Sequence, residues 1–438
     1  MIKFFFKSLV LLITLSLLLI VFFKPEYVKY ALSNNLSFET KAKIKTFLFG
    51  EDFMKEVANL KYYQSLNYNT EFLPSTQFTK LNIKKISLKD LELSNQSQHY
   101  GKFGPKGNKK FFLEEFKGKI YIVDVGGKIF SKKISDIKNN EIKWKKVSSN
   151  LRSIEIYDLL DTTVINENLY VSYATILKSQ KNKTVSEQCK NYSIFKANLN
   201  KDDLNFEKVF ISNECVIIAV GGRMQALKFK NVEGFLFTVG ATSEEAEFAQ
   251  DDSTIIGKIL FFDLSNNTFQ LFSKGHRNPQ GLYVDENVII STEHGPRGGD
   301  EINRIEFNRN FGWPIASYGE KYSSKENLKN YEYKKKHNAF NFVEPIISFV
   351  PSIGISEIIK LDQGFTNLWQ DNYIIASLGA KAIYRILFDE NFTKVLFSEK
   401  IFIGDRIRDM KFIKKDNSIL LALENKHGEI MILKGKNE

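Results

Sequence analysis

The sequence predicts an all-β protein whose strands begin after an apolar N-terminal segment. From Lys110 onward, short runs rich in Ile, Val, Phe and Tyr alternate with turns that contain Gly, Asn and Asp. This part is about 330 residues long, too long for one small sandwich, whereas six blades of about 55 residues divide it comfortably. No fixed repeat motif is visible, so a pair of β-sandwiches stays the alternative. We predict a six-bladed β-propeller, preceded by an N-terminal membrane helix and a partly helical stalk.

Residues 1–23 are predicted to be a signal anchor or transmembrane segment. The run from Ser8 to Phe23 is apolar and uncharged, and Lys3 and Lys7 precede it. It is short for a bilayer, although Phe4–Phe6 extend it towards the ~20 residues that a spanning helix needs. No small-x-small cleavage site closes the run, which favours an uncleaved anchor with its positive end inside. We therefore expect a bacterial inner-membrane protein whose main domain faces the periplasm.

Residues 24–90 are predicted to be a stalk with a segment that leads onto the main domain. They show no sustained period, although 37–60 contains amphipathic, helix-like turns, and Pro74 with Ser75 marks a break. The main domain is assigned to residues 91–438. Its strands are expected in the runs KIYIVDVGGKIF, NLYVSYATIL, GFLFTVG, GKILFFDL, NYIIASLG and SILLALE.

The composition is that of a globular protein and argues against a nucleic-acid partner. Hydrophobic residues make up 43% and charged residues 26% of the chain, which suits a sizeable core. The net charge of +11 is carried by lysines spread along the chain, and the densest group, 334–336, lies in a polar insertion. Since no nucleic-acid fold motif accompanies these lysines, we interpret them as a solvated surface.

Cys189 and Cys215 are the only cysteines. In an oxidising, exported compartment a single disulfide is plausible, and two buried free thiols are the alternative. Their spacing does not suggest a metal site.

Residues 275–314 concentrate rare residue types. The chain has nine arginines, and four of them lie here, which suggests a need for the planar guanidinium that grips carboxylates and quinone-like oxygens. His276 and His294 each adjoin a glycine and lie just outside strand-like runs, where a rigid sheet presents ligand-binding loops. Polar turns with arginines that cap carbonyls are the structural alternative. The four arginines are Arg277, Arg297, Arg304 and Arg309.

The ordered motifs GHRNPQG, EHGPRGGDEIN and NFGWP in this block resemble the signature of the glucose/sorbosone dehydrogenase family, soluble sugar dehydrogenases that use pyrroloquinoline quinone. Further landmarks are GGRM at 221–224, VPS at 350–352, SLGAKAIYRI at 377–386 and DRIRDM at 405–410. The resemblance covers about residues 105–435. It implies a six-bladed propeller that carries the quinone on one end and oxidises an aldose by hydride transfer, with a separate electron acceptor.

The resemblance also implies which residues hold the cofactor. Arg277 and Asn278 match one contacting pair, Arg406 and Arg408 match a second, and Ser352 matches a hydroxyl contact. A spacing of two on an extended strand puts both later arginines on one face. The three carboxylates and the ortho-quinone of the cofactor explain the arginines.

Calcium in the family is bound near the EHGP segment, largely through backbone carbonyls, which implies Gly295 and Pro296 here. The neighbouring Asp300 and Glu301 supply either nearby charge or structural hydrogen bonds.

Three positions depart from the family. The histidine that acts as general base is Ala219 here, and the aspartate that orients it is Ala241. The cofactor-contacting lysine is Gly379, with Lys381 two residues later. Loss of a positioned base typically lowers the rate by about two to four orders of magnitude.

Two functions therefore remain open. The first is a sugar dehydrogenase with a relocated base, for which the candidates are the histidines His276 and His294 and the carboxylates Glu244, Glu245 and Asp251. The second is a non-catalytic propeller that binds a quinone, a sugar or a protein partner at the cell envelope.

Overall fold

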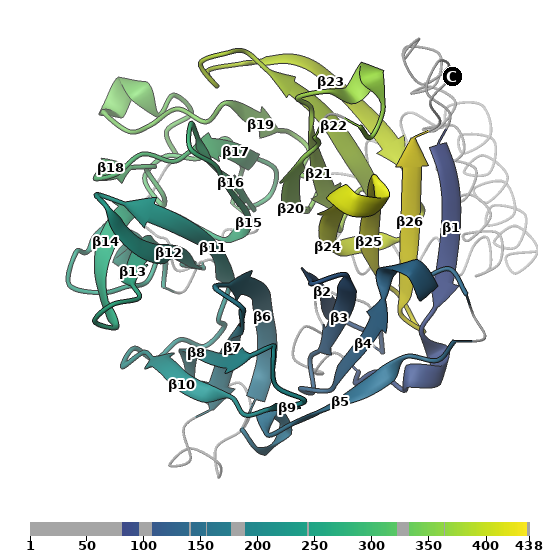
Figure 1. Cartoon of the computed structure of the whole chain (residues 1–438). Helices are drawn as coiled ribbons and strands as arrows, with labels where there is room; N and C mark the ends of the chain where they lie inside the picture. The colour runs from purple at the N-terminus through teal and green to yellow at the C-terminus, as the bar shows by residue number, and fades with distance from the viewer. Residues whose placement is uncertain are drawn as a thin grey trace, which may run out of the picture. The chain divides into compact units, whose positions relative to one another are not determined.

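The computed structural model describes residues 81–95, 107–139, 142–154, 156–176, 189–242, 245–321, 333–362 and 364–435. In these ranges six sheets stand around a central channel, so the predicted six-bladed all-β propeller is confirmed (Figure 1). The only helical turns in these ranges are short 3-10 turns, and none of them is long and apolar enough to cross a bilayer. The predicted anchor at 1–23 and the stalk up to residue 80 lie outside the described residues.

Each sheet is built on an antiparallel meander of four strands that runs from the channel outwards, and two of the sheets gain a short parallel strand at the outer edge. The first contains β2 (Phe111–Phe116), β3 (Lys119–Asp124), β4 (Ile129–Lys133) and β5 (Lys145–Ser149), with the short β9 (Asp203–Leu204) at its edge. The second contains β6 (Ile156–Ile165), β7 (Asn168–Ile176), β8 (Lys190–Asn198) and β10 (Glu207–Ile211). The third contains β11 (Gly221–Phe229), β12 (Val232–Val239), β13 (Lys258–Asp263), β14 (Thr268–Lys274) and β18 (Arg309–Asn310).

The remaining sheets complete the ring. The fourth contains β15 (Pro279–Val284), β16 (Ile289–Glu293), β17 (Asp300–Arg304) and β19 (Ile347–Phe349). The fifth contains β20 (Ile355–Lys360), β21 (Tyr373–Ser377), β22 (Ala382–Phe388) and β23 (Val395–Phe402). The sixth contains β24 (Arg406–Ile413), β25 (Ser418–Glu424), β26 (Glu429–Gly435) and β1 (Leu81–Ser87).

The two ends of the described chain close the ring together. β1 pairs antiparallel with β26, from Leu81 opposite Gly435 to Ser87 opposite Glu429. β1 thereby supplies the outermost strand of the last sheet (Figure 1). Residues 81–87 belong to the segment that we assigned to 24–90, so the propeller begins about ten residues before the assigned boundary.

The apolar runs of the middle strands follow from this arrangement. Each sheet packs against a neighbour on both faces, so both faces of a strand are buried and the sequence reads as a continuous apolar run rather than an alternation. In β12 the last six residues are all buried. Aromatic side chains fill the space between sheets, as where Phe235 stacks on Phe262 with ring centroids 5.0 Å apart.

Cys189 and Cys215 form a disulfide, which decides between the two alternatives that the sequence left open. It ties the start of β8 to the loop that precedes β11.

The meander topology gathers the ends of the inner strands. A sheet of four antiparallel strands returns the chain to the end where its first strand began, so all six inner strands begin at the same end of the channel. We call this the amino end and the opposite one the carboxyl end. The inner strands are β2, β6, β11, β15, β20 and β24.

Candidate functional site

The predicted cofactor residues meet at the amino end of the channel. Arg277 and Asn278 precede β15, Ser352 lies in the loop before β20, and Arg406 and Arg408 open β24. The inner strands thus bring together motifs that lie more than a hundred residues apart.

Gln280 links two of these motifs directly. Its Nε2 donates to Asn278 Oδ1 at 2.7 Å, and Arg408 Nη1 reaches Gln280 Oε1 at 3.4 Å. Asn278 Oδ1 also accepts from the backbone N–H of Gly221, at 3.1 Å. Sequence reasoning did not assign a role to Gln280, although it lies inside the GHRNPQG motif.

Arg277 holds an unused donor at this end. Its Nη1 donates to the carbonyl of His294 at 3.0 Å, and its guanidinium lies 5.3 Å from the ring centre of Trp313. Its Nε is buried and has no hydrogen-bond partner among the residues that the structure describes. A buried N–H without a partner is costly, so this atom points to a ligand with an acceptor oxygen.

His276 is held inside the protein. The ring is fully buried, with Nε2 2.8 Å from Ser273 Oγ and Nδ1 3.1 Å from Glu293 Oε2, and it stacks on Phe311 at 4.7 Å. The other carboxylate oxygen of Glu293 accepts the backbone N–H groups of Arg277 and Asn278. His276 therefore orients Glu293, which fixes the loop that carries Arg277.

His294, the second candidate histidine, is partly accessible. Its Nε2 contacts the carbonyl of Ile355, and because a carbonyl only accepts, Nε2 carries the proton and Nδ1 carries the lone pair. Burial lowers the pKa of His294; the charge of Asp300 opposes this shift, whereas Arg277 and Arg408 act in the same direction as burial. At neutral pH the ring is uncharged.

The carboxylates proposed as alternative bases are not free at the candidate site in the part of the chain that the structure describes. Glu245 is buried and accepts from the N–H of Ile217 at 3.0 Å and from Thr242 Oγ1 at 2.6 Å. Asp251 is exposed and bonds Ser253. Glu244 lies outside the described residues.

Arg406 and Arg408 share one buried carboxylate. Arg406 Nε lies 3.1 Å from Glu424 Oε1, and Arg408 donates to Glu424 Oε2 through Nε at 2.8 Å and Nη2 at 2.6 Å. Both arginines thus face one side, as their spacing predicts. Although burial acts to raise it, Arg408 and Arg406 hold the pKa of Glu424 below its ordinary value. The trio carries a net charge of +1.

Glu424 could not be found from the sequence. It ends the run SILLALE and stands directly opposite Arg406 in the β24–β25 register. That pairing depends on the register of two strands, which the sequence does not display. Beside the trio, Lys110 and Asp158 form a further buried ion pair at 3.0 Å.

The loop around Gly295 offers backbone oxygens. A Cβ added at Gly295 would lie 2.1 Å from the carbonyl oxygen of Gly299 and 2.4 Å from that of Gly298, so only glycine fits among them. Such oxygens suit a hard cation like calcium. No group of three or more His, Cys, Asp or Glu side chains within the described ranges is placed to hold a metal. The predicted ligands Gly295 and Pro296 stay a prediction.

Asp300 is the structural anchor of this loop. One oxygen accepts from Gly295 N–H at 3.1 Å and from Ser352 Oγ at 2.8 Å, and the other accepts from the N–H groups of Ile353 and Ile355, both at 3.0 Å. The Ser352 hydroxyl therefore gives its proton to Asp300 and is left with lone pairs that can accept.

Comparison with known proteins agrees with this geometry. The sequence pattern of the Glucose / Sorbosone dehydrogenase family matches residues 102–432. The chain belongs to the glucose/sorbosone dehydrogenase family. The resemblance inferred from the motifs is confirmed.

Individual relatives of this family member are distant. The chain is 28% identical over 222 residues to aldose sugar dehydrogenase YliI of Escherichia coli, a match that covers 47% of this chain and 58% of the relative. The chain spans about half the length of the curated relatives that it matches first.

Solved structures share the fold. The apo form of soluble aldose sugar dehydrogenase from Escherichia coli is similar with a TM-score of 0.63 at 18% identity, over 81% of this chain and 100% of that one. The aldose sugar dehydrogenase of Streptomyces coelicolor in its PQQ-bound form is similar with a TM-score of 0.55 at 16% identity, over 82% and 99%. At these identities the similarity shows the propeller fold alone.

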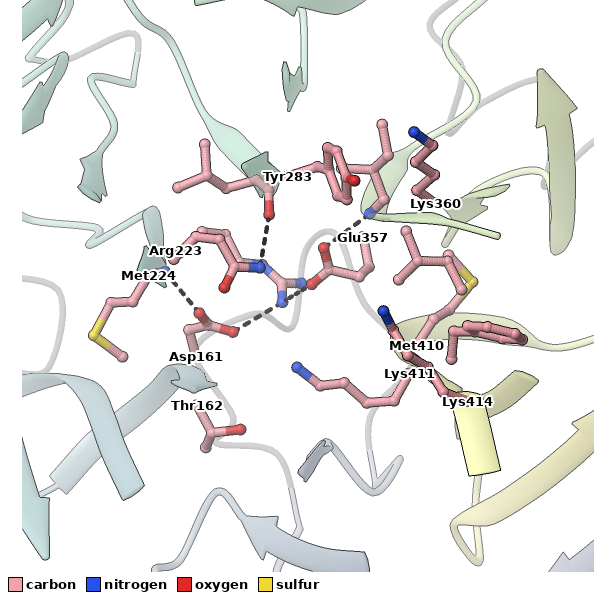
Figure 2. Close-up of a pocket in the computed structure, with 15 residues that line it drawn as sticks. Asp161, Thr162, Arg223, Met224, Tyr283, Glu357, Lys360, Met410, Lys411 and Lys414 are labelled. Atoms are coloured by element: carbon pink, nitrogen blue, oxygen red, sulfur yellow. Dashed lines mark hydrogen bonds and ion pairs between the residues drawn. The ribbon is translucent and has the colours of Figure 1, made fainter. Parts of the chain in front are cut away.

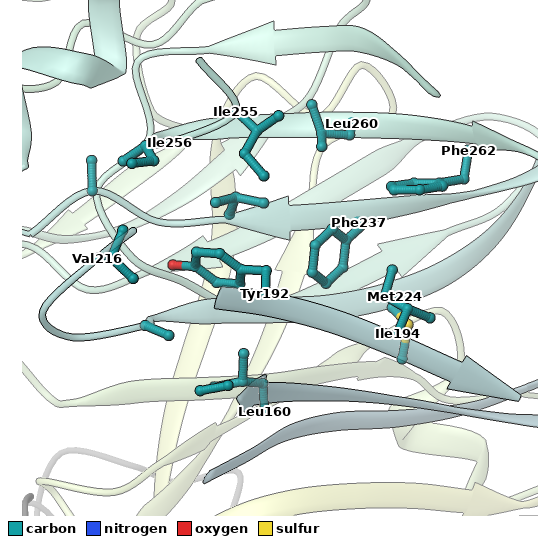
Figure 3. Packing of buried hydrophobic residues seen from close by; sticks show 14 of the residues in the cluster. Leu160, Tyr192, Ile194, Val216, Met224, Phe237, Ile255, Ile256, Leu260 and Phe262 are labelled. Atoms are coloured by element: carbon teal, nitrogen blue, oxygen red, sulfur yellow. The ribbon is translucent and has the colours of Figure 1, made fainter. Parts of the chain in front are cut away.

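The two positions that the resemblance matches to the base and the orienting aspartate of the glucose/sorbosone dehydrogenase family are packed among apolar side chains. Ala219 is 3% exposed and Ala241 is fully buried, and both belong to one hydrophobic cluster. Figure 3 shows part of this cluster, which includes Tyr192, Val216 and Ile256. Ala241 N–H donates to the carbonyl of Arg277 at 2.7 Å, so the segment packs directly against the cofactor motif.

The family lysine position also lacks a charge. Gly379 is exposed, and a Cβ there would lie 2.7 Å from the carbonyl oxygen of Ile353. Arg406 Nη1 reaches towards this loop, 3.5 Å from the carbonyl of Leu378. The Lys381 side chain is exposed, and its carbonyl accepts from the N–H groups of Ile403 and Gly404.

A buried ionic layer crosses the channel below the arginines. Arg223, 2% exposed, donates from Nη1 to Asp161 at 2.9 Å and to Glu357 at 2.5 Å (Figure 2). Its Nη2 also reaches the carbonyl of Arg408, at 3.2 Å. Lys411 pairs with Glu114 at 3.0 Å. Sequence reasoning used GGRM only as a landmark and did not anticipate that its arginine would stand at the centre of this layer.

A cavity of about 190 Å³ opens from this layer towards the carboxyl end (Figure 2). Its lining includes Tyr283, Lys360 and Lys414, which lie late in the inner strands or after them. The cavity is therefore at the opposite end of the channel from Arg277 and is not the predicted cofactor site.

We expect the free energy of unfolding to fall as the pH rises from about 5 to about 9. Burial raises the pKa of Asp161 to about 6, of Glu357 to about 7 and of Glu114 to about 8. A carboxyl whose pKa is raised in the folded state adds stability below its unfolded pKa, and this is lost as the pH passes its folded pKa. The loss should be on the order of a few kcal/mol. Urea unfolding at pH 5, 7 and 9 measures it.

Glu114→Gln should remove the part of this loss between pH 7 and 9. Glu115→Gln, at an exposed position on the same strand, should leave the profile unchanged. Identical profiles for wild type and Glu114→Gln would contradict the assignment.

Proposed function

We propose that this chain binds pyrroloquinoline quinone at the amino end of the channel and oxidises an aldose there. The observation that carries the proposal is the buried Arg277 Nε without a partner in the described part of the chain, on a guanidinium packed over Trp313. Membership of the family and the PQQ-bound relative support the choice of ligand.

The donors fit a planar anion with several carboxylates. Arg277 would hold one carboxylate through Nε, because a guanidinium pairs bidentately with such groups. Arg406 would provide a second contact, because Glu424 accepts only from Nε of Arg406 and leaves the terminal nitrogens of that guanidinium for a ligand. Arg408 would contribute mainly through Nη1, which also reaches Gln280, because Glu424 engages its other two nitrogens. Asn278 and the Ser352 oxygen would complete the set.

When bound, the quinone accepts the hydride, and the protein must take the proton from the substrate hydroxyl. We propose His294 for that task, because its ring is neutral and its Nδ1 carries a lone pair. His276 has both ring nitrogens engaged in the core. Calcium at the carbonyls of Gly295 and Pro296 is part of the proposal.

A non-catalytic propeller is the second candidate. It is favoured by Ala219 and Ala241, since apolar packing replaces the proton-transfer pair at the family position. In this case the arginines would bind the quinone, a sugar or a protein partner without turnover.

Titration of the full chain with pyrroloquinoline quinone, with calcium and again with a chelator, tests both functions through the cofactor spectrum. We expect saturable binding, then a spectral change of the cofactor on addition of aldoses. His294→Ala should slow that change by about two to four orders of magnitude and leave binding within a few fold. Binding without any aldose-dependent change would favour the non-catalytic protein, and absence of binding would eliminate the quinone from both.

We also propose that residues 1–23 anchor the chain and that the propeller is exported to the periplasm. The Cys189–Cys215 disulfide supports an oxidising compartment. Digestion of the propeller by a protease added outside spheroplasts, with a cytoplasmic protein intact, is the expected result, and protection of the propeller would contradict export.

A further inference from the structure

Three apolar side chains are exposed beside the candidate site. Ile217 is 44% exposed, Ile218 is 42% exposed and Phe248 is 45% exposed. We call these three residues the isoleucine wall. They lie in two loops of the amino end, the one before β11 and the one between β12 and β13.

The isoleucine wall is continuous with the base position. Ile218 directly precedes Ala219 in the chain. Ile217 N–H donates to the Glu245 carboxylate at 3.0 Å, and Phe248 N–H donates to the Glu245 carbonyl at 3.1 Å, so one residue joins the two loops.

From this wall the chain leads straight to the predicted cofactor site. Ala241, in the same loop as Phe248, is bonded to the carbonyl of Arg277. Because the loop that carries Phe248 is bonded to the Arg277 segment, we expect a substrate held near Arg277 to lie close to the isoleucine wall.

Two polar side chains of these loops, Glu245 and Gln250, are already paired with other protein groups. Both oxygens of Glu245 accept from neighbours, one of them from Thr242. Gln250 donates to the carbonyl of Trp313 at 2.6 Å and exchanges hydrogen bonds with Asn310. An unsubstituted hexose lying here would lose water from its hydroxyls and meet isoleucine and phenylalanine instead, which is unfavourable.

The exposed area of the isoleucine wall indicates the size of the group that could cover it. Three side chains at these exposures offer on the order of 250 Å², taking roughly 200 Å² for a whole large side chain. A stable protein interface buries about 800 Å² per partner, so the wall is too small to dock a protein by itself. It matches one short alkyl or acyl chain.

We infer that the substrate of this site is an aldose that carries a short apolar substituent, such as an acyl group on a hydroxyl remote from the reacting carbon, and that the substituent packs on the isoleucine wall. The inference rests on the proposed sugar oxidation for the reaction. The contact with the wall itself needs no cofactor.

Calorimetric titration of the full chain without added quinone tests that contact, with 6-O-hexanoylglucose and glucose as probes. We expect the ester to bind at least about tenfold more tightly, since burial of two methylene groups already gives that factor. The double variant Ile217→Ser, Ile218→Ser should bring the two affinities to within about twofold. Leu396→Ser, at an exposed position on β23, is the matched control and should leave the preference unchanged.

Equal binding of the two probes to the wild type, or a preference that survives in the double serine variant, would overturn the inference. Failure of the proposed function has a different signature, namely no spectral change when the quinone is added. Preference for the ester without quinone binding would keep the wall as a binding site and remove only the dehydrogenase. If glucose reduced the quinone as efficiently as the ester does, the sugar oxidation would stand, and the claim that the substrate carries an apolar substituent would be refuted.

Discussion

Arg277→Leu is expected to weaken the binding of pyrroloquinoline quinone by at least about a hundredfold. The variant removes the buried Nε donor and the fixed guanidinium over Trp313. A hydrogen bond to a charged group contributes about 1.5 to 3 kcal/mol, so loss of two such bonds corresponds to roughly two to four orders of magnitude in affinity. Titration of the cofactor followed by its absorption measures the effect.

Two further variants make this result specific. Arg277→Lys keeps the charge but not the planar fork, so we expect it to recover only a small part of the affinity. Arg309→Leu removes an exposed arginine from the same segment of sequence and should bind as the wild type does. Equal affinity of Arg277→Leu and wild type would show that the cofactor is held elsewhere.

Arg223→Met is expected to destabilise the propeller by about 3 to 5 kcal/mol. It leaves the carboxylates of Asp161 and Glu357 buried without their cation, with Asp409 3.5 Å away from the lost group. Removal of one partner from a buried ionic group is costly because the remaining charges cannot regain water. The free energy of unfolding in urea measures the loss.

Lys228→Met is the matched control on the same strand. Lys228 is exposed and lies 3.6 Å from Glu233, an exposed pair worth less than about 1 kcal/mol. The destabilisation of Arg223→Met should also shrink at pH 5, where Asp161 and Glu357 take up protons. A loss of stability no larger than that of Lys228→Met would show that the ionic layer contributes little.

Much of the fold is readable from local sequence. The strand runs and their turns predict the all-β class, because each sheet is buried on both faces and needs continuous apolar strands. The choice of a propeller over a pair of β-sandwiches depended mainly on the family resemblance. β1 was not predicted as part of it, since its run LNIKKIS is only partly apolar and it pairs with a strand almost 350 residues later. Outer strands face solvent, so their sequences contain more polar residues and are harder to recognise as strands.

The candidate site divides in the same way. The family resemblance points to Arg277, Asn278, Arg406 and Arg408, whose role with a cofactor stays a prediction, and the structure places them at one end of the channel. Gln280 and Glu424 were missed, although they bridge or neutralise those residues. Their polar side chains have no distinctive local pattern, and only strand register brings them into contact.

The amino-acid order thus suffices for the all-β class and the family motifs, and through the resemblance it raises the hypothesis that Ala219 and Ala241 replace the proton-transfer pair. Only the folded chain decides which charged groups remain available to a ligand: Glu424 neutralises much of the arginine pair, His276 is enclosed in the core, and Arg277 retains a donor. The physical reason is that hydrogen bonds and screened charges act over a few ångströms in space, between residues that the sequence keeps far apart.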